Sequence, residues 1–240
     1  MAKTSVVIVV LLTSQLASTY IWERDSTENL YSELQKIPRA SVTARKLVQN
    51  FMQYDRSLGR VQQNMIFLLD SSLSIGKSGF KRQVYAVRSI IRNCPANSRF
   101  AAIGFSTSAN VSFNFTSARD ADKLLQQFQY IGAMTNTQKA LQQAMNMFRG
   151  TRSSRWNVIN KILLITDGLS TVDQQLTIYR GFQLKRMGVQ LFVIAMGTKV
   201  YGMPEVLGLV SSVHRHLFRV RDLSQLLLVT WRAEARLKRR

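Results

Sequence analysis

The sequence has few of the residues that build disulfides and zinc sites. It contains one cysteine, Cys94, and two histidines in 240 residues. A single cysteine excludes an internal disulfide framework and a cysteine-based zinc site. We expect Cys94 to be a half-buried free thiol, with pairing to another chain as the alternative. His214 and His216 lie two apart on an expected strand with no third ligand nearby, so we expect surface residues rather than a zinc site.

Acidic residues are also scarce. The chain has 13 Asp and Glu against 33 Lys and Arg, which gives a formal net charge of +20. Such an excess attracts anionic partners, which include nucleic acid, sulfated glycans and anionic membrane surfaces. Charge alone does not choose among them. Because acids are few, the position of each one is informative.

The sequence has no apolar run long enough to span a bilayer. A short apolar run lies at the N-terminus. "MAKT", "SVVIVVLL" and "TSQLASTY" follow one another as a basic start, an apolar run and a small polar end. This order predicts a signal peptide over residues 1–19, and the run is too short to span a bilayer. The alternative is a buried N-terminal strand, since Val and Ile also favour strands. Two sequons, at Asn110 and Asn114, fit a secretory route as candidate glycosylation sites.

Residues 20–63 are polar and charged, and part of this segment has helical spacing. Four apolar residues fall on one face of the expected helix: Leu47, Val48, Phe51 and Met52. Ser41 is the expected N-cap of that helix. We interpret 20–63 as a helical leader segment packed on the main domain, with a flexible linker as the alternative.

From residue 64 onward, apolar runs alternate with amphipathic helical patterns. The runs that predict strands are 65–69, 99–106, 111–115, 161–166, 189–196 and 216–220. The helical patterns cover about 77–92, 119–128, 137–149, 173–187, 203–212 and 222–237. Continuous apolar strands separated by helices predict an α/β fold, a doubly wound and mostly parallel six-stranded sheet with helices on both faces. The short connection between 99–106 and 111–115 predicts one antiparallel edge strand.

Oxygen-bearing side chains gather where the expected strands end. "DSSLS" places Asp70, Ser72 and Ser74 after the first strand, where alternate residues share one side. "GAMTNTQKAL" offers Thr135 and Thr137, and "LLITDGLS" places Asp167 after the fourth strand. In a doubly wound sheet, ligands bind beyond the carboxyl ends of the strands. Carboxylates and hydroxyls without histidine or cysteine suit Mg²⁺, Mn²⁺ or Ca²⁺.

These three motifs, in this order, resemble the von Willebrand factor type A (vWA) domain with its metal-ion-dependent adhesion site (MIDAS). "GVQLFVIAMG" and "HLFRVRDLSQL" are similar to the last strands and final helix of that family, so the resemblance covers about 64–235. It implies a Rossmann-like vWA fold. It also implies that Thr137 begins a helix and supports the site without being a metal ligand. It also implies five metal ligands: Asp70, Ser72, Ser74, Thr135 and Asp167. The family often has glycines at the positions of Ala133 and Met134. Here these two larger residues either narrow access to the metal site or simply fill space beside it.

The resemblance implies ligand recognition without turnover. We expect a secreted, extracellular protein that is not an enzyme. It should bind protein ligands of the extracellular matrix or cell surface through a divalent cation, which we expect to be Mg²⁺, with Mn²⁺ or Ca²⁺ as alternatives. Sulfated glycans are further candidate partners, and a transmembrane segment is not expected. The alternative is an intracellular vWA protein that binds nucleic acid or another anion through its basic surface. A metal-assisted phosphohydrolase is a third hypothesis, without a nucleophile–base pair to support it.

Residues 236–240, "RLKRR", form a basic tail. The tail fits a solvated helix end, because cations interact favourably with the partial negative charge at the C-terminus of a helix. It also fits a patch that binds glycans or phosphate, and it resembles a furin-type processing site. The expected organisation is therefore a signal peptide (1–19), a helical leader (20–63), a vWA domain (64–235) and a basic tail (236–240).

Overall fold

The computed structural model describes residues 31–52, 61–151, 158–168 and 170–239. The chain divides into two compact units, Met1–Lys36 and Ile37–Arg240. In the first unit, residues 31–35 are helical. The signal peptide expected over 1–19 lies outside the described residues. Within the described ranges, no helix is both long and apolar enough to cross a membrane.

The second unit is built on a six-stranded sheet with the order β3-β2-β1-β4-β5-β6. The strands are β1 (Gln62–Asp70), β2 (Ser98–Phe105), β3 (Ala109–Thr116), β4 (Val158–Thr166), β5 (Gln190–Met196) and β6 (Leu217–Val220). Every neighbouring pair is parallel except β2 and β3, so the edge strand β3 is antiparallel. This confirms the predicted doubly wound fold. It also places the carboxyl ends of β1 and β4 side by side, where the strand order reverses.

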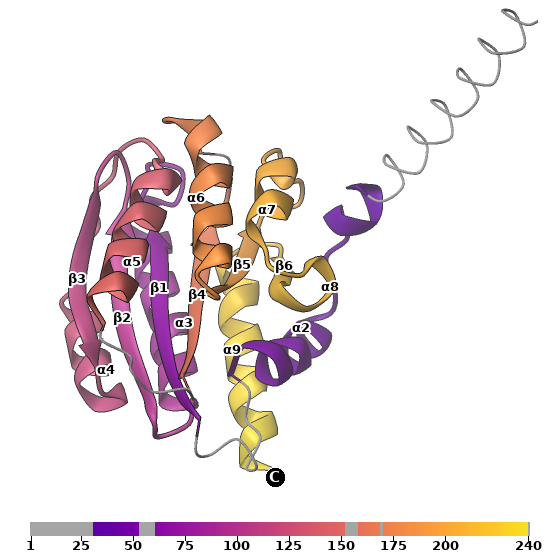
Figure 1. The fold of residues 1–240 in the computed structure, drawn as a ribbon. Coiled ribbons are helices and arrows are strands. Elements are labelled where there is room, and N and C mark those ends of the chain that lie inside the picture. Colours follow the sequence, from indigo (N-terminus) through magenta and orange to yellow (C-terminus); the bar gives the residue numbers. More distant parts are fainter. Residues whose placement is uncertain (1–30, 53–60, 152–157, 169, 240) are drawn as a thin grey trace, which may run out of the picture. The chain divides into compact units, whose positions relative to one another are not determined.

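The strands are apolar throughout because both faces of the sheet are covered. In β1, Met65, Phe67 and Leu69 belong to a hydrophobic core cluster on one face, while the alternating Ile66 and Leu68 are equally buried on the opposite face. Helices cover each side (Figure 1). One layer holds α3 (Gly76–Arg92), α4 (Ala118–Gln126) and α9 (Leu223–Lys238). The other holds α5 (Thr137–Gly150), α6 (Gln174–Arg186) and α7 (Met203–Leu209).

Part of the leader segment packs into the second unit. Its chain forms α2 (Ala40–Lys46), which continues into a wider turn, η1 (Leu47–Met52). The four apolar residues expected on one face are all buried. Phe51 is fully buried, with its ring 6.0 Å from that of Phe67 and 5.0 Å from that of Phe192. The predicted N-cap Ser41 was wrong, because the helix begins at Ala40 and the N-cap position is held two residues earlier by Arg39, without a side-chain cap.

The buried Lys161 of β4 ties the leader to the sheet. Its ammonium group donates hydrogen bonds to the Phe51 carbonyl at 2.6 Å and to the Gln63 side chain at 2.7 Å. Burial lowers the pKa of Lys161 to about 7. Cys94 is a free thiol packed at the margin of the core, with its sulfur 3.9 Å from that of Met65. Burial raises the Cys94 pKa to about 12, which keeps the thiol protonated and unreactive.

The strand expected over 216–220 is β6, which begins at Leu217, one residue later than expected. Val213–His216 form a short helix, α8, so the two histidines do not lie on a strand. His214 is exposed, but His216 is half-buried, and its ring stacks on Phe192 with centroids 3.9 Å apart. Burial lowers the pKa of His216 to about 4. Helix α9 runs to Lys238, so the first residues of the expected basic tail continue the helix.

Candidate metal centre

Asp70 is the last residue of β1 and is completely buried. One carboxylate oxygen accepts the Ser72 N–H at 2.9 Å, and the other accepts the Thr166 hydroxyl at 2.8 Å. Burial raises the pKa of Asp70 to about 6, hydrogen bonds from the Ser72 side chain, the Thr166 hydroxyl and the Ser72 N–H oppose the rise, and the charge of Asp167 adds to it. The carboxylate is therefore fixed in position, and its charge is poorly solvated.

The two predicted serine ligands lie next to each other beyond Asp70. The Ser72 and Ser74 hydroxyl oxygens are 3.0 Å apart, with Ser72 buried and Ser74 exposed. The Ser72 carbonyl accepts the Tyr130 hydroxyl at 3.1 Å, which holds the turn against the following loop. The hydroxyls thus converge from the buried side of the loop to its surface, as the alternation after Asp70 predicted.

The segment before α5 brings Thr135 to the same edge. Ser72 forms a β-bridge with Ala133, and the Leu73 N–H donates to the Ala133 carbonyl at 3.0 Å. The backbone of Thr135 is held by Thr171, whose hydroxyl accepts its N–H at 3.0 Å. Thr135 is nearly buried. Its hydroxyl makes no hydrogen bond to any residue that the structure describes.

Asp167 follows directly on β4, next to the strand that ends in Asp70. Its neighbour Thr166 donates to Asp70, and the Asp167 charge contributes to the raised pKa of Asp70, so Asp70 and Asp167 lie near each other at this edge. Asp167 is half-exposed, and its carboxylate hydrogen-bonds to none of the described residues. The structure thus brings the loops of all five predicted ligands together at one edge of the sheet.

The chemistry of this donor set fits a hard divalent cation. Two carboxylates balance the charge of the ion, and three hydroxyls add oxygen ligands without further charge. The buried Asp70 carboxylate has no cationic side chain as a hydrogen-bond partner within the described part of the chain, and a bound cation would favour its charged form. The described residues contain no cluster of three or more His, Cys, Asp or Glu, so the hydroxyls are indispensable to such a site.

Three apolar side chains surround the candidate site at the surface. Leu73, between the two serine ligands, is 70% exposed, Met134 is 55% exposed and Ile131 is 40% exposed. Met134 therefore lies at the rim and does not fill interior space. Together these residues, which we call the apolar rim, offer contact area beside the carboxylates. The bridge between Ser72 and Ala133, which the sequence does not reveal, brings Leu73 and Met134 to the same part of the surface.

Supporting residues that sequence reasoning missed hold the loop after β4. The Ser170 hydroxyl accepts the Thr137 N–H at 3.3 Å, where α5 begins, and lies 3.4 Å from the Thr135 carbonyl, to which it donates. The Ser170 N–H donates in turn to the carboxylate of Glu205 on α7 at 3.3 Å. Burial raises the pKa of Glu205 to about 7. The serine and threonine content of "DGLSTVD" was the available signal, but it does not identify the partners.

We expect Glu205→Gln to stabilise the chain more at pH 8 than at pH 5. The folded-state pKa of Glu205 lies above its unfolded value, so its contribution to stability is full below about pH 4.5 and is lost as pH rises through 7. Glutamine keeps the acceptor for Ser170 without a buried charge. The relative gain at pH 8 should be about 1–2 kcal/mol, allowing for solvent screening. Urea unfolding at both pH values measures it.

The matched control is Glu234→Gln on the surface of α9, which should change stability equally at both pH values. An equal effect of Glu205→Gln at pH 5 and pH 8 would contradict the assigned burial cost.

The candidate glycosylation sites lie on the edge strand β3. Asn110 and Asn114 are both exposed on β3. Both side chains are therefore accessible, and their modification stays a prediction.

Comparison with known proteins identifies the fold family. Residues 64–231 match the family described as von Willebrand factor type A domain. Human von Willebrand factor A domain-containing protein 2 is 29% identical over 140 residues, which cover 55% of this chain and 18% of that protein. The human collagen alpha-6(VI) chain is 26% identical in a match that covers 62% of this chain and 7% of that protein. Mouse matrilin-2 is 24% identical in a match that covers 67% of this chain and 18% of that protein. The chain thus spans less than a fifth of the length of these relatives.

Solved structures agree on the fold. Proximal thread matrix protein 1 from the mussel byssus superposes with a TM-score of 0.64 at 21% identity, covering 71% of this chain and 46% of that one. A second structure of that protein, with a zinc-occupied MIDAS motif, has a TM-score of 0.62 at 19% identity, covering 75% and 46%. The family match covers more than half of the chain and agrees with the observed sheet order. The chain belongs to the von Willebrand factor type A domain family.

Proposed function

We propose that the chain is a secreted binding protein that uses one divalent cation to recognise a protein ligand of the extracellular matrix or cell surface. Asp70, Ser72, Ser74, Thr135 and Asp167 would hold the cation. The observation that carries the proposal is the position of Asp70 and Asp167 at the ends of the neighbouring strands β1 and β4, with the Ser72 and Ser74 hydroxyls in the loop after β1. The bound ion would supply a positive centre for a carboxylate of the ligand.

Two further observations support this proposal. The relatives include matrix proteins such as a collagen VI chain and matrilin-2, and in the byssus matrix protein a MIDAS motif holds zinc. The apolar rim of Leu73, Ile131 and Met134 suits a protein surface better than a small anion, because exposed apolar side chains gain by being covered. Mg²⁺ is the proposed resident ion, since all of the proposed ligands are oxygens.

We propose binding without turnover. The proposed ligand set contains neither histidine nor cysteine, so it supplies no imidazole base and no thiolate beside the Ser72 and Ser74 hydroxyls. The site therefore has oxygen ligands for a cation but no activated nucleophile. Hydrolysis of a phosphate ester by the wild-type chain, absent in Asp167→Ala, would contradict this part of the proposal.

The proposed function is tested by binding of the full chain to immobilised matrix proteins in Mg²⁺ and in EDTA. We expect at least about tenfold tighter binding in Mg²⁺, because the ligand carboxylate completes the ion's coordination. Replacing Leu73 by serine should weaken the Mg²⁺-dependent part without removing the response to EDTA. Binding that is equally strong in EDTA would contradict a role for the cation.

A further inference from the structure

The face of α9 that points away from α3 carries arginines without acidic partners. Arg232, Arg236 and Arg239 are spaced by four and three residues, so they project from one side of the helix. Glu234 and Lys238 pair with each other at 2.7 Å on another side. Within the described ranges, none of the three arginines forms an ion pair. Their charge is therefore available to an external anion.

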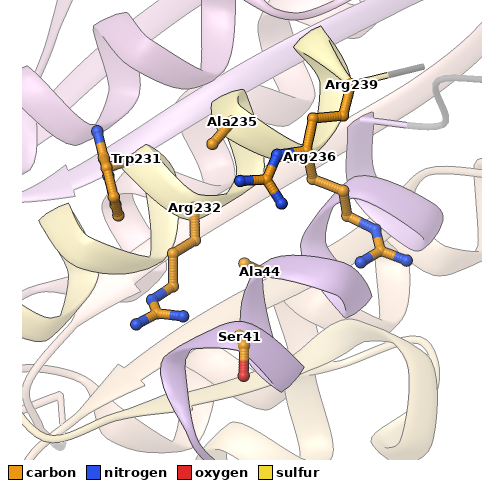
Figure 2. Close-up of a pocket in the computed structure, with 7 residues that line it drawn as sticks. All are labelled: Ser41, Ala44, Trp231, Arg232, Ala235, Arg236 and Arg239. Carbon is orange, nitrogen blue, oxygen red and sulfur yellow. The ribbon is translucent and has the colours of Figure 1, made fainter.

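These arginines line a groove between α9 and the leader helix α2. Figure 2 shows their side chains extending from α9 on the side of Ser41 and Ala44, which lie on α2. The hollow has a volume of about 540 Å³. A neighbouring hollow of about 570 Å³ shares Ser41 and Arg232 with the first, so the two hollows are adjacent and together form a depression along α2 and α9. We call it the α2–α9 groove.

The second hollow adds two more arginines, Arg39 and Arg221. Its one acidic residue, Asp222, is occupied as the N-cap of α9, where its side chain accepts the Gln225 N–H at 2.8 Å. Five arginines against one capping carboxylate make the α2–α9 groove strongly positive. The guanidinium group is always charged, and its planar donors match the oxygens of sulfate, phosphate and carboxylate groups.

The shape of the groove suits a linear chain. Its lining residues on α9 run from Ser224 to Arg239, which is about 22 Å of helix at roughly 1.5 Å per residue. A single small anion would use one or two of these arginines. A polymer that carries an anionic group at short intervals can contact arginines along the whole length, and it gains from the release of its own counterions.

We propose that the α2–α9 groove binds a sulfated polysaccharide chain. The groove is concave, so it does not fit a flat membrane surface, and it offers no projecting element to enter a duplex groove. Trp231, 63% exposed, is the one aromatic residue that lines it, whereas single-stranded nucleic acids need several stacking side chains. The choice of a sulfated glycan also rests on the extracellular location in the proposed function.

The first hollow of the groove lies away from the candidate metal centre, whereas the second hollow reaches Arg221 and Ser224 at the edge where β6 ends. The metal-site loops follow the carboxyl ends of β1 and β4, whereas α9 follows the parallel strand β6 and runs back along the sheet (Figure 1). Arg232, Arg236 and Arg239 are therefore toward the edge where the strands begin. A matrix protein at the metal centre and a glycan in the groove could be held at the same time.

The test measures binding of a fluorescent, size-defined heparin oligosaccharide to the full chain in EDTA at about 0.15 M salt, where distant surface charges are screened. Changing Arg232, Arg236 and Arg239 together to glutamine should weaken binding at least tenfold. The matched control changes Arg119, Lys123 and Arg149 to glutamine, since these are exposed cations on α4 and α5. It removes the same charge and should weaken binding less than twofold.

A second variant guards against loss of structure in the triple mutant. Ser41→Glu keeps every arginine and places one negative charge at the wall shared by both hollows. It should weaken binding by about fivefold through charge repulsion. Equal losses in the groove triple and the control triple would overturn the proposal, as would unchanged binding by Ser41→Glu.

Three competing probes identify the ligand class: the desulfated oligosaccharide, a single-stranded oligonucleotide of equal charge, and phosphatidylserine vesicles. The sulfated oligosaccharide should bind most tightly, and a stronger competitor would overturn the proposal. Recovery of the chain from culture medium without sulfate-dependent binding would overturn the groove assignment alone. Retention of the chain inside cells would instead overturn the location on which both proposals rest.

Discussion

Replacing Asp167 by asparagine should abolish the increase in unfolding temperature that divalent ions give the wild-type chain. An ion at a hundred times its dissociation constant stabilises the folded state by about 2.7 kcal/mol. For a domain of this size, that corresponds to a rise of about 5–10 °C. Asparagine removes one of the two carboxylates at the edge of β1 and β4, so the site could no longer balance the charge of the ion. Thermal unfolding in EDTA and in Mg²⁺, Mn²⁺ or Ca²⁺ measures the difference.

The matched control is Asp173→Asn. Asp173 is an exposed carboxylate in the same loop, with a left-handed backbone (φ 49°) that asparagine tolerates, and its side chain accepts a hydrogen bond from Gln138 at 3.2 Å. The control removes the same charge but no proposed ligand, so it should keep the full ion-dependent rise. A rise that survives in Asp167→Asn would show that ions act elsewhere on the chain.

Phe51→Ala should lower the free energy of unfolding by about 3–5 kcal/mol. The ring is fully buried and makes edge contacts with Phe67 and Phe192, and its backbone carbonyl accepts the buried Lys161 ammonium. Deleting it leaves a cavity between the leader and the sheet. Urea unfolding should show a lower midpoint with an unchanged slope.

Val42→Ala, on the exposed side of α2 in the same leader, is the control and should change stability by no more than about 0.5 kcal/mol. A loss below about 1 kcal/mol for Phe51→Ala would mean that the leader packs loosely and is not part of the cooperative unit. The family match begins at residue 64, so the result decides whether the folded domain of this chain extends beyond that match.

The strands and their mostly parallel arrangement could be predicted because both faces of the sheet are buried. A continuous run such as "MIFLL" has few alternatives to a central parallel strand, and the polar residues that follow it then fall at the carboxyl edge. The same reasoning placed Asp70 and Asp167 at strand ends, and the observed sheet order makes those two strands neighbours. Periodicity also identified the buried face of the leader, since Leu47, Val48, Phe51 and Met52 had no other reason to repeat at helical spacing.

Other features depend on tertiary contacts that no local pattern contains. Thr166 looked like the end of an apolar strand, yet its hydroxyl holds the Asp70 carboxylate. His216 was expected on the surface of a strand, but the short helix α8 turns its ring onto Phe192. The α2–α9 groove exists because the leader packs beside the last helix, and residues 41 and 232 are far apart in the sequence.

The central claim is that one divalent ion is held by Asp70 and its neighbours. Calorimetric titration of the EDTA-treated, dialysed chain with Mn²⁺ tests it most directly. The account predicts one ion bound per chain in the wild type and an affinity at least about a hundredfold lower in Asp70→Asn, since even outer partners of metal ligands contribute ten- to a hundredfold. The absence of binding in the wild type, or unchanged binding in Asp70→Asn, would contradict it.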